Sequence, residues 1–468
     1  MEKLAVLNCD RFKFTITTEN CLFFMILGFI YISGKHISLM TENYETAQKI
    51  RELAMEHNDF FRKSIPLIAS ENIMSPLAME MLLTDFGFRY AEGLPHHRYY
   101  QGNFYVDQVE DITIDLAKKL FRSDQADPRP VSGTNANTSV IYGLLKPGDK
   151  ISTPPLSGGG HISAAKFGAV GLRGLDIVNY PFDVENMNLD VDGTIKLIKN
   201  ERPKVCLFGQ SVFLFPTPLK DLKDAAAEVG AKIWYDGAHV LGLIAGGKFQ
   251  DPLREGAEII TGSTHKTLPG PQHGIILGKT DESAWKSVQR GVFPGTISNH
   301  HINAMAALGV TLAEELDYGT EYAGKIIENA KYLASCLAED GFKVLGEKNG
   351  YTESHTLVVD VRDNGGGKYV AELLEKSGIV LNKNLLPWDD GNRSQDPSGL
   401  RIGTQEVTRI GFGKSEMKEI SRLVKMAVID KKSPEMVKKE AADLKSRFRK
   451  VKYCYGDLEA YKYIKLLN

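Results

Sequence analysis

The chain lacks the composition that marks several protein classes. It has only five cysteines among 468 residues, an odd number without a Cys-x-x-Cys pair. This argues against a disulfide framework or a zinc site, and it favours a reducing compartment, the cytoplasm. Neither charge is in large excess, since 57 Lys and Arg face 59 Asp and Glu for a net charge of -2. Without a basic field, a nucleic-acid partner is not expected. The cysteines are Cys9, Cys21, Cys206, Cys336 and Cys454.

A membrane-spanning run is also missing. The apolar stretch at residues 21–34, CLFFMILGFIYISG, is too short to cross a bilayer comfortably. It lies late for a signal peptide, and no A-x-A-like cleavage site follows it. Met40 then opens an ordinary amphipathic helix, TENYETAQKIRELAMEH. We interpret residues 1–39 as a misassigned extension upstream of the real start. A membrane-associating extension is the alternative, and no membrane partner is expected otherwise.

The middle of the chain alternates strand and helix patterns. Between residues 203 and 278 the apolar runs KVCLF, KIWYD, EIITG and GIILG are short, and a helical pattern, PLKDLKDAAAEVG, separates the first two. This predicts an α/β fold with a mostly parallel, doubly wound sheet. From about residue 326 the pattern changes to α+β, as expected for a smaller C-terminal domain. We expect an N-terminal helix and arm at 40–95, a large domain at 96–325 and a small domain at 326–468.

Ionisable side chains follow the predicted buried strands. Ser211, Asp236, His239 and Lys266 all lie at or just after strand ends, where ligands collect in such sheets. Pro269, Gly270 and Pro271 forbid a helix after Lys266, so this lysine belongs to a tight connection between two buried strands. A lysine held away from water can act as an amine nucleophile. A lysine that merely caps a turn is the alternative.

Two glycine-containing segments suit a phosphorylated, flat ligand. Residues 132–137, SGTNAN, open a helix and present backbone N–H groups that suit a phosphate, although they form neither a Walker A loop nor a GxGxxG turn. His161 follows three glycines that permit close approach to the backbone. An ordinary capped helix and a solvated loop histidine are the alternatives.

Two further regions carry residue types that favour binding. Residues 64–102 combine polar aromatics, histidines, glycines and prolines, which is typical of a site or an interface but also of a surface loop. Arg401 lies between Leu400 and Ile402 in a predicted strand, so we expect it to bind a carboxylate, either of a ligand or of an internal salt bridge. The lysine-rich tail, residues 433–468, is explained by a solvated helix face.

Together these residues indicate pyridoxal phosphate (PLP). A buried lysine would form a Schiff base with the cofactor, and an aspartate thirty residues upstream would keep the pyridine nitrogen protonated. The chain then resembles the serine hydroxymethyltransferases, of the aspartate aminotransferase fold type. The resemblance covers residues 45–425 and rests on eight motifs in the family's order: LIASEN, YAEGLP-HHRYYQGN, SGTNAN, GGGH, DGAHVLGLI, STHKTLPGP, FPG and GLRIGT.

The resemblance implies a role for each matching residue. Lys266 would bind the cofactor covalently, Asp236 would pair with its ring nitrogen and His161 would stack on the ring. Arg401 would hold the substrate carboxylate, assisted by Ser70. The remaining cofactor contacts implied by the resemblance are Gly133 and Thr134 at the phosphate, Ser263 and His265 nearby, and Ser211 and His239 around the ring.

The resemblance also implies a homodimer whose site is shared between chains. Tyr90, Glu92, Tyr100 and the backbone near Gly295 would reach the partner's site. Glu92 would handle the proton of the serine hydroxyl, and Tyr100 would contact the substrate carboxylate. The expected pterin contacts are Leu156, Ile162 and Asn384, and no metal is implied.

The implied reaction transfers the hydroxymethyl carbon of L-serine to a reduced pterin carrier and leaves glycine. Gln272 and His273 stand where many members have arginine and glycine, and Thr134 with Asn135 stands where Ser-Gln is common. These departures resemble archaeal members, some of which use tetrahydromethanopterin in place of tetrahydrofolate. Two alternatives stay open, a carrier-independent 3-hydroxy amino acid aldolase and a non-catalytic dimeric relative. The latter predicts loss of Lys266, Asp236, Glu92 or Arg401, all of which are present.

Overall fold

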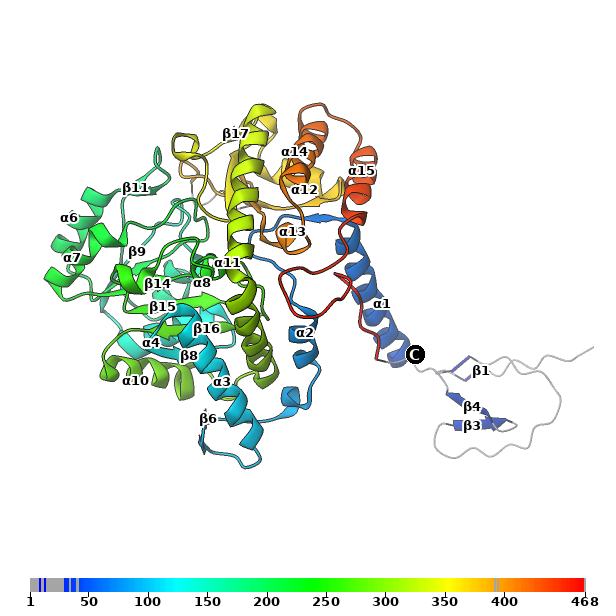
Figure 1. Ribbon diagram of the computed structural model, residues 1–468, viewed down its shortest axis with the longest axis horizontal. Helices are drawn as coiled ribbons and strands as arrows, with labels where there is room; N and C mark the ends of the chain where they lie inside the picture. Colours follow the sequence, from blue (N-terminus) through cyan, green and yellow to red (C-terminus); the bar gives the residue numbers. More distant parts are fainter. Residues whose placement is uncertain are drawn as a thin grey trace, which may run out of the picture. The chain divides into compact units, whose positions relative to one another are not determined.

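The computed structural model describes residues 42–390, 393 and 395–466, together with four short N-terminal strands (Figure 1). The chain divides into two compact units, residues 1–61 with 463–468, and residues 62–462. In the first unit β1 pairs with β2 and β3 with β4, both antiparallel. The interpretation of residues 1–39 as an extension falls largely outside the described residues. The elements of this part are β1 (Asn8–Cys9), β2 (Phe12–Lys13), β3 (Phe29–Ile32), β4 (Lys35–Ser38) and α1 (Glu42–Lys63), whose last two residues belong to the second unit.

The second unit is built on a seven-stranded sheet of order β10-β9-β13-β14-β15-β16-β8. The five strands from β10 to β15 are mutually parallel, and β16 is antiparallel to both of its neighbours. The prediction of a mostly parallel sheet is therefore confirmed. The strands are β8 (Gln125–Asp127), β9 (Lys150–Thr153), β10 (Asp176–Asn179), β13 (Val205–Phe208), β14 (Lys232–Asp236), β15 (Ile259–Ser263) and β16 (Gly274–Gly278).

Both faces of this sheet are buried. Successive side chains of a strand point to opposite faces, so each strand contributes to two cores. Trp234 and Ile259 pack into a core with helix residues of α4 and α10, whereas Tyr235 and Ile260 pack into another with α7, α8 and α11. This explains why the strands read as continuous apolar runs. The helices and short elements of this domain are α3 (Phe104–Phe121), α4 (Gly133–Leu144), η2 (Ile162–Ala164), α5 (Ala169–Leu172), β11 (Phe182–Asp183), β12 (Asn188–Leu189), α6 (Val191–Glu201), α7 (Leu219–Val229), α8 (Leu241–Ala245), α9 (Pro252–Glu255), α10 (Glu282–Arg290) and η3 (Gly291–Thr296).

One helix, α11 (Ile302–Glu339), runs for 38 residues between the two halves of this unit. Its first half contributes Leu308 and Leu312 to the core of the large sheet, and its second half contributes Leu333 and Leu337 to a separate core. The sequence pattern changes near residue 326, where we expect a domain boundary, but the structure has one helix passing through that point. The helix continues because its buried positions recur at helical spacing across the boundary.

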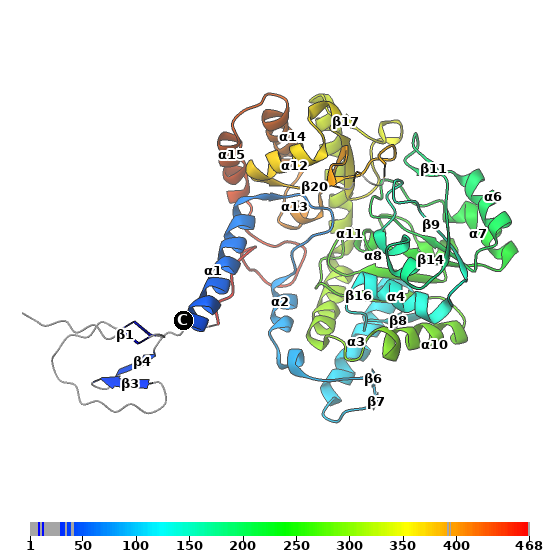
Figure 2. The ribbon, with the colours of Figure 1, turned by 180° about the vertical axis from the view of Figure 1, so that it is seen from behind.

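The remaining residues form the predicted α+β arrangement. A four-stranded antiparallel sheet of order β17-β18-β21-β20 carries α12, α14 and α15 (Figure 2). Residues 65–67 join the core of this sheet, and β5 pairs with β19. The elements of this arrangement are β5 (Ile65–Pro66), β17 (Lys343–Val344), η4 (Glu347–Asn349), β18 (Thr356–Asp360), η5 (Arg362–Asn364), α12 (Gly367–Lys376), β19 (Ile379–Val380), β20 (Asn382–Asn384), β21 (Gly399–Gly403), α13 (Gln405–Arg409), α14 (Lys414–Val428) and α15 (Pro434–Ser446). The segment between β5 and α3 adds α2 (Pro76–Leu82), η1 (Asp85–Phe88), β6 (Gly93–Leu94) and β7 (His97–Arg98).

Within the described ranges, no helix has the length and hydropathy needed to cross a bilayer. The same residues contain no cluster of His, Cys, Asp and Glu suited to a metal ion.

Candidate active site

Lys266 lies in the tight connection between the antiparallel strands β15 and β16, where the sequence places it. The connection is closed by backbone hydrogen bonds from Gly270 N to Thr264 O (2.8 Å) and from Thr264 N to His273 O (3.1 Å). The Lys266 side chain is only 7% exposed. Burial lowers the pKa of Lys266 to about 8, with the positive charge of Arg401 acting in the same direction and Asp236 opposing it. The amine therefore loses its proton far more readily than an exposed lysine does.

Asp236 ends β14, beside the lysine. Its Oδ1 accepts a hydrogen bond from Ala238 N (3.0 Å), and its Oδ2 accepts one from Asn137 Nδ2 (2.7 Å). Asn137 Oδ1 in turn accepts from Thr261 Oγ1 (2.6 Å), so the amide is fixed from both sides. Sequence reasoning assigned no role to Asn137. The available signal was its place in the SGTNAN motif, one turn into α4, but nothing in the sequence shows which strand that turn faces.

His161 follows the glycine run and caps the short helix η2. Its Nδ1 accepts a hydrogen bond from Ser163 N (3.1 Å), which leaves a neutral ring with its proton on Nε2. Burial lowers the pKa of His161, and the charges of Lys266 and Arg401 lower it further against the opposing effect of Asp236. The structure thus brings Asp236, Lys266 and Arg401 close enough to His161 for their charges to change its pKa.

Arg401 stands at the centre of β21, and its bonds go to neutral acceptors. Its Nη1 donates to Ser211 O (2.8 Å) and its Nε to Asn382 Oδ1 (3.1 Å). Burial lowers the pKa of Arg401 to about 10. Among the residues that the structure describes, no carboxylate forms an ion pair with it, which removes the internal salt bridge considered from the sequence. A guanidinium held this way keeps its capacity for a carboxylate ligand.

His239 is fully enclosed near this arginine. Its Nε2 lies 3.5 Å from Arg401 Nη1, and its Nδ1 lies 3.4 Å from His355 Nε2. His355 Nε2 is also 3.2 Å from Ala69 O, next to Ser70, which is half-buried. Burial lowers the pKa of His239 well below its ordinary value, so this ring is neutral at pH 7. His355 was missed from the sequence because an isolated histidine before a strand has no pattern.

The SGTNAN turn and the end of β15 meet closely. Ser132 Oγ accepts from Asn135 N (3.0 Å) at the start of α4, and a Cβ at Gly133 would overlap Ser263 Oγ. His265 is half-buried, and its buried Nδ1 has no hydrogen-bond partner among the described residues. Burial and the charge of Lys266 lower the pKa of His265 to about 4. An N-terminal helix turn that only glycine fits, next to an unsatisfied buried nitrogen, fits the phosphate of PLP.

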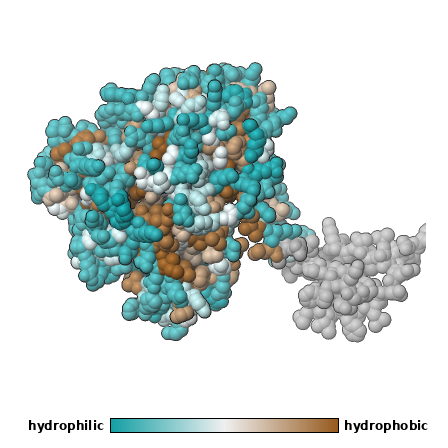
Figure 3. Space-filling model, in the orientation of Figure 1, coloured by the Kyte–Doolittle hydropathy of each residue, from teal (hydrophilic) through white to brown (hydrophobic). Residues whose placement is uncertain are grey.

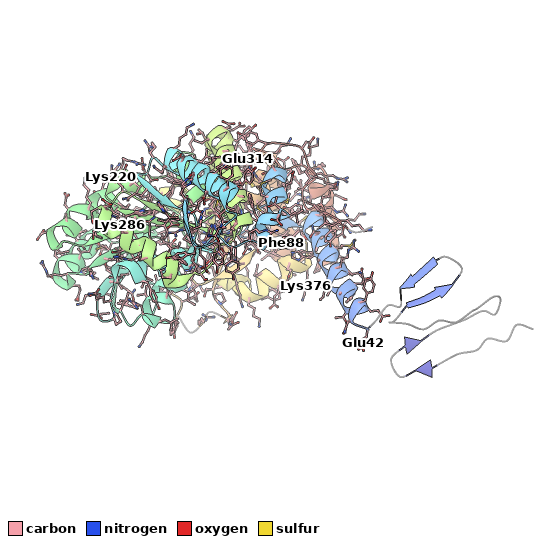
Figure 4. All side chains as sticks on the ribbon, turned by 90° about the horizontal axis from the view of Figure 1, so that it is seen from below. Glu42, Phe88, Lys220, Lys286, Glu314 and Lys376 are labelled. Atoms are coloured by element: carbon pink, nitrogen blue, oxygen red, sulfur yellow. The ribbon has the colours of Figure 1, made fainter. Side chains whose placement is uncertain are left out.

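Among the described residues, no hydrogen bond, ion pair or ring contact joins Lys266 to the loop residues assigned to a partner's site. Tyr90 and Tyr100 are 55% and 45% exposed and contact each other, with ring centroids 5.4 Å apart. Glu92 accepts a hydrogen bond from Ser298 Oγ, and Gly295 is exposed in η3. Phe88, labelled in Figure 4, is 79% exposed at the start of the same loop.

The residues expected to contact a pterin lie in two places. Leu156 and Ile162 flank the glycine run that precedes His161, and Ile162 is 59% exposed. Asn384 ends β20 and donates from Nδ2 to Leu385 O (2.7 Å). Thr134, in the first turn of α4, is exposed.

These features define a class. A buried lysine beside a buried aspartate at neighbouring strand ends, with a phosphate-suited helix start and a small α+β domain supplying an arginine, characterises the PLP-dependent enzymes of fold type I.

Comparison with known proteins narrows the class. The family model described as serine hydroxymethyltransferase matches residues 44–424. The chain is 69% identical over 427 residues to a serine hydroxymethyltransferase of Picrophilus torridus, covering 91% of this chain and 99% of the relative. It is 66% identical to the one of Thermoplasma volcanium (91% and 100% covered) and 51% identical to that of Methanocella arvoryzae (86% and 95%). The chain belongs to the serine hydroxymethyltransferase family, a family of PLP-dependent transferases.

Proposed function

We propose that this protein transfers the hydroxymethyl carbon of L-serine reversibly to a reduced pterin carrier, giving glycine and the methylene carrier. The single observation that carries the proposal is the buried Lys266 of lowered pKa between Asp236 and Arg401, in a chain of this family. The proposed compartment is the cytoplasm, and the proposed large and small domains are those expected from the sequence.

PLP, held by Lys266 and the Gly133–Thr134 turn with Ser263 and His265, would supply the electron sink for bond cleavage at the serine α-carbon. Asp236, fixed by Asn137 and Ala238 N, would hold a proton on the ring nitrogen. Ser211 and His239 would contact the ring from the Arg401 side, and His161 would cover its face.

Arg401 would bind the substrate carboxylate with its fork, with Ser70 beside it. Its existing partners, Ser211 O and Asn382 Oδ1, orient the guanidinium without neutralising it. Because Arg401 is buried, a missing carboxylate would leave a buried charge without an opposite charge, which favours binding of amino acids.

Glu92 would take and return the proton of the serine hydroxyl in the partner's site, with Tyr90 and Tyr100 alongside. Exposed aromatic side chains in this loop support a homodimer. Figure 3 shows hydrophobic residues gathered over the lower part of α11 on the face drawn. Separately, Phe104 and Ile112 of α3 are 70% and 58% exposed. A patch of this kind suits a second copy of the chain.

The carrier is proposed as tetrahydrofolate or tetrahydromethanopterin, contacted by Leu156, Ile162 and Asn384. The test is serine cleavage by the purified chain with PLP and each carrier in turn. Glycine formation that depends on one carrier supports the proposal and identifies that carrier. Cleavage of allo-threonine with serine cleavage independent of either carrier would favour the aldolase, and no cleavage with bound PLP would refute both.

A further inference from the structure

The C-terminal segment, residues 447–462, is hydrogen-bonded to α13 and α11, and we call it the C-terminal strap. Its Lys452 N donates to Arg409 O (2.8 Å), and Arg409 Nη1 donates to Tyr453 O (2.6 Å). Tyr455 N donates to Glu314 Oε1 on α11 (3.0 Å). The solvated helix face expected for residues 433–468 therefore describes α15 but not the strap.

The strap places one aromatic ring on α11. Tyr453 stacks on Tyr322, with ring centroids 5.1 Å apart and an interplanar angle of 28°. Tyr322 is only 1% exposed, and the Arg409 guanidinium lies 5.3 Å from its ring centroid. The Tyr322 ring is therefore held by packing from the strap and from α13.

The Tyr322 hydroxyl is linked to the backbone of Lys266 through the side chain of Asn72. It donates to Gln405 O (2.9 Å), so its oxygen is free to accept the bond from Asn72 Nδ2 (2.9 Å). The same Nδ2 donates to Lys266 O (2.6 Å), while Asn72 Oδ1 accepts from Ile73 N (2.9 Å). Carbonyl oxygens can only accept, so these contacts fix the orientation of the amide without ambiguity.

We infer that Asn72 and Tyr322 are positioning residues that fix the peptide of Lys266, and that the C-terminal strap braces them through Tyr453. The inference rests on the proposed function, in which Lys266 binds PLP. Neither residue touches the reacting atoms. They act on the lysine backbone, whose displacement would carry the amine away from its working position.

The strands alone do not hold this peptide. The hydrogen bonds that close the β15–β16 connection join Thr264, Gly270 and His273, on either side of Lys266. Asn72 comes from the segment that also bears Ser70, and Gln405 anchors that segment by donating from Nε2 to Ile68 O (2.8 Å) and Glu71 O (2.6 Å). One network thus positions the lysine and the proposed substrate-binding serine together.

The test compares Tyr322→Phe with Tyr318→Phe in the full-length protein. Both substitutions remove one hydroxyl from α11 next to the strap, since Tyr318 contacts Tyr455 (5.7 Å between centroids). Among the described residues, Asn72 donates to the hydroxyl of Tyr322 and not to that of Tyr318. Two properties are measured. One is kcat and KM for serine in the PLP-loaded enzyme. The other is the pH midpoint for modification of Lys266 by an amine-reactive ester in the cofactor-free protein, read by peptide mass spectrometry.

We expect Tyr322→Phe to lower kcat roughly tenfold with KM changed by less than about twofold, because a displaced amine affects the reaction more than binding. We also expect the modification midpoint to move upward from about 8, because a loosened connection admits water to the amine. Tyr318→Phe should match wild type in both, and Asn72→Ala should reproduce the Tyr322→Phe changes.

Wild-type kcat and midpoint in Tyr322→Phe would overturn the inference, and so would a lower melting temperature with both properties unchanged. If the wild-type protein fails to attach PLP at Lys266, the proposed function fails instead, so the two failures are distinguishable.

Discussion

Two groups of functional residues in this chain are held in opposite ways. The group around Lys266 is buried and hydrogen-bonded from several elements: Asp236 by Asn137, Arg401 by Asn382 and Ser211. The loop group of Tyr90, Glu92 and Tyr100 is more accessible: Glu92 accepts a hydrogen bond from Ser298, and Tyr90 contacts Tyr100.

The difference indicates how much each group depends on its own chain. Burial tunes the first group before any ligand arrives, as the lowered pKa values of Lys266 and Arg401 indicate. The second group keeps its accessible surface until something covers it. If the proposed dimer forms, the first group determines cofactor chemistry and the second adds the proton transfer to serine.

The largest expected effect comes from the buried group. Lys266→Ala removes the amine and should lower kcat for serine cleavage by roughly 10³-fold or more, because the covalent attachment is lost. Lys279→Ala, an exposed lysine after β16, serves as the control and should match wild type. Wild-type turnover by Lys266→Ala would remove the lysine from the mechanism.

A mixing experiment tests whether the buried group and the loop group of one active site come from different chains. Lys266→Ala and Glu92→Gln proteins should each be inactive alone. After unfolding and refolding together, their mixture should regain about a quarter of wild-type activity, because half of the dimers are mixed and each mixed dimer has one intact site. Absence of recovery, in a mixture that forms dimers normally, would place Glu92 in the site of its own chain.

Substitution of Arg401 should change KM for serine more than kcat. Arg401→Lys keeps the charge but loses the fork, and we expect KM for serine to rise roughly tenfold to a hundredfold with a smaller fall in kcat. Arg362→Lys, at a half-exposed position paired with Asp360, is the matched control. An unchanged KM in Arg401→Lys would mean that the carboxylate binds elsewhere.

The smallest effect is on stability. The folded-state pKa of Lys266, about 8, lies below the ordinary value of 10.5, so the unfolded chain binds more protons between these pH values. Stability therefore rises with pH across this window, and below it the buried amine costs about 3 kcal/mol. Lys266→Met should stabilise the cofactor-free protein by up to about this amount at pH 7, and the gain should shrink between about pH 8 and pH 10.5. Urea unfolding at both pH values measures it, and a pH-independent gain would contradict the buried-charge explanation.

The sequence predicts the sheet and the strand ends well, because apolar runs and their polar ends are local signals. It does not reveal Asn72, Asn137 or Asn382, whose amides join segments far apart in the chain. It also divides α11 at a boundary of composition, although helical burial continues through Tyr322 and Ile326. The return of the C-terminal strap to α11 depends on tertiary contacts of single backbone groups, which leave no pattern. The assigned roles of the site residues remain predictions.

The continuity of α11 bears on how the enzyme loses its structure. This single helix supplies side chains to the core of the large sheet from its first half and to the core of the small sheet from its second half. Melting either core removes the support of half of this helix, and so withdraws packing from the other core. We therefore expect calorimetry of residues 62–462 within the full chain to record a single cooperative transition, and a fragment cut at residue 325 to lack independent cooperativity.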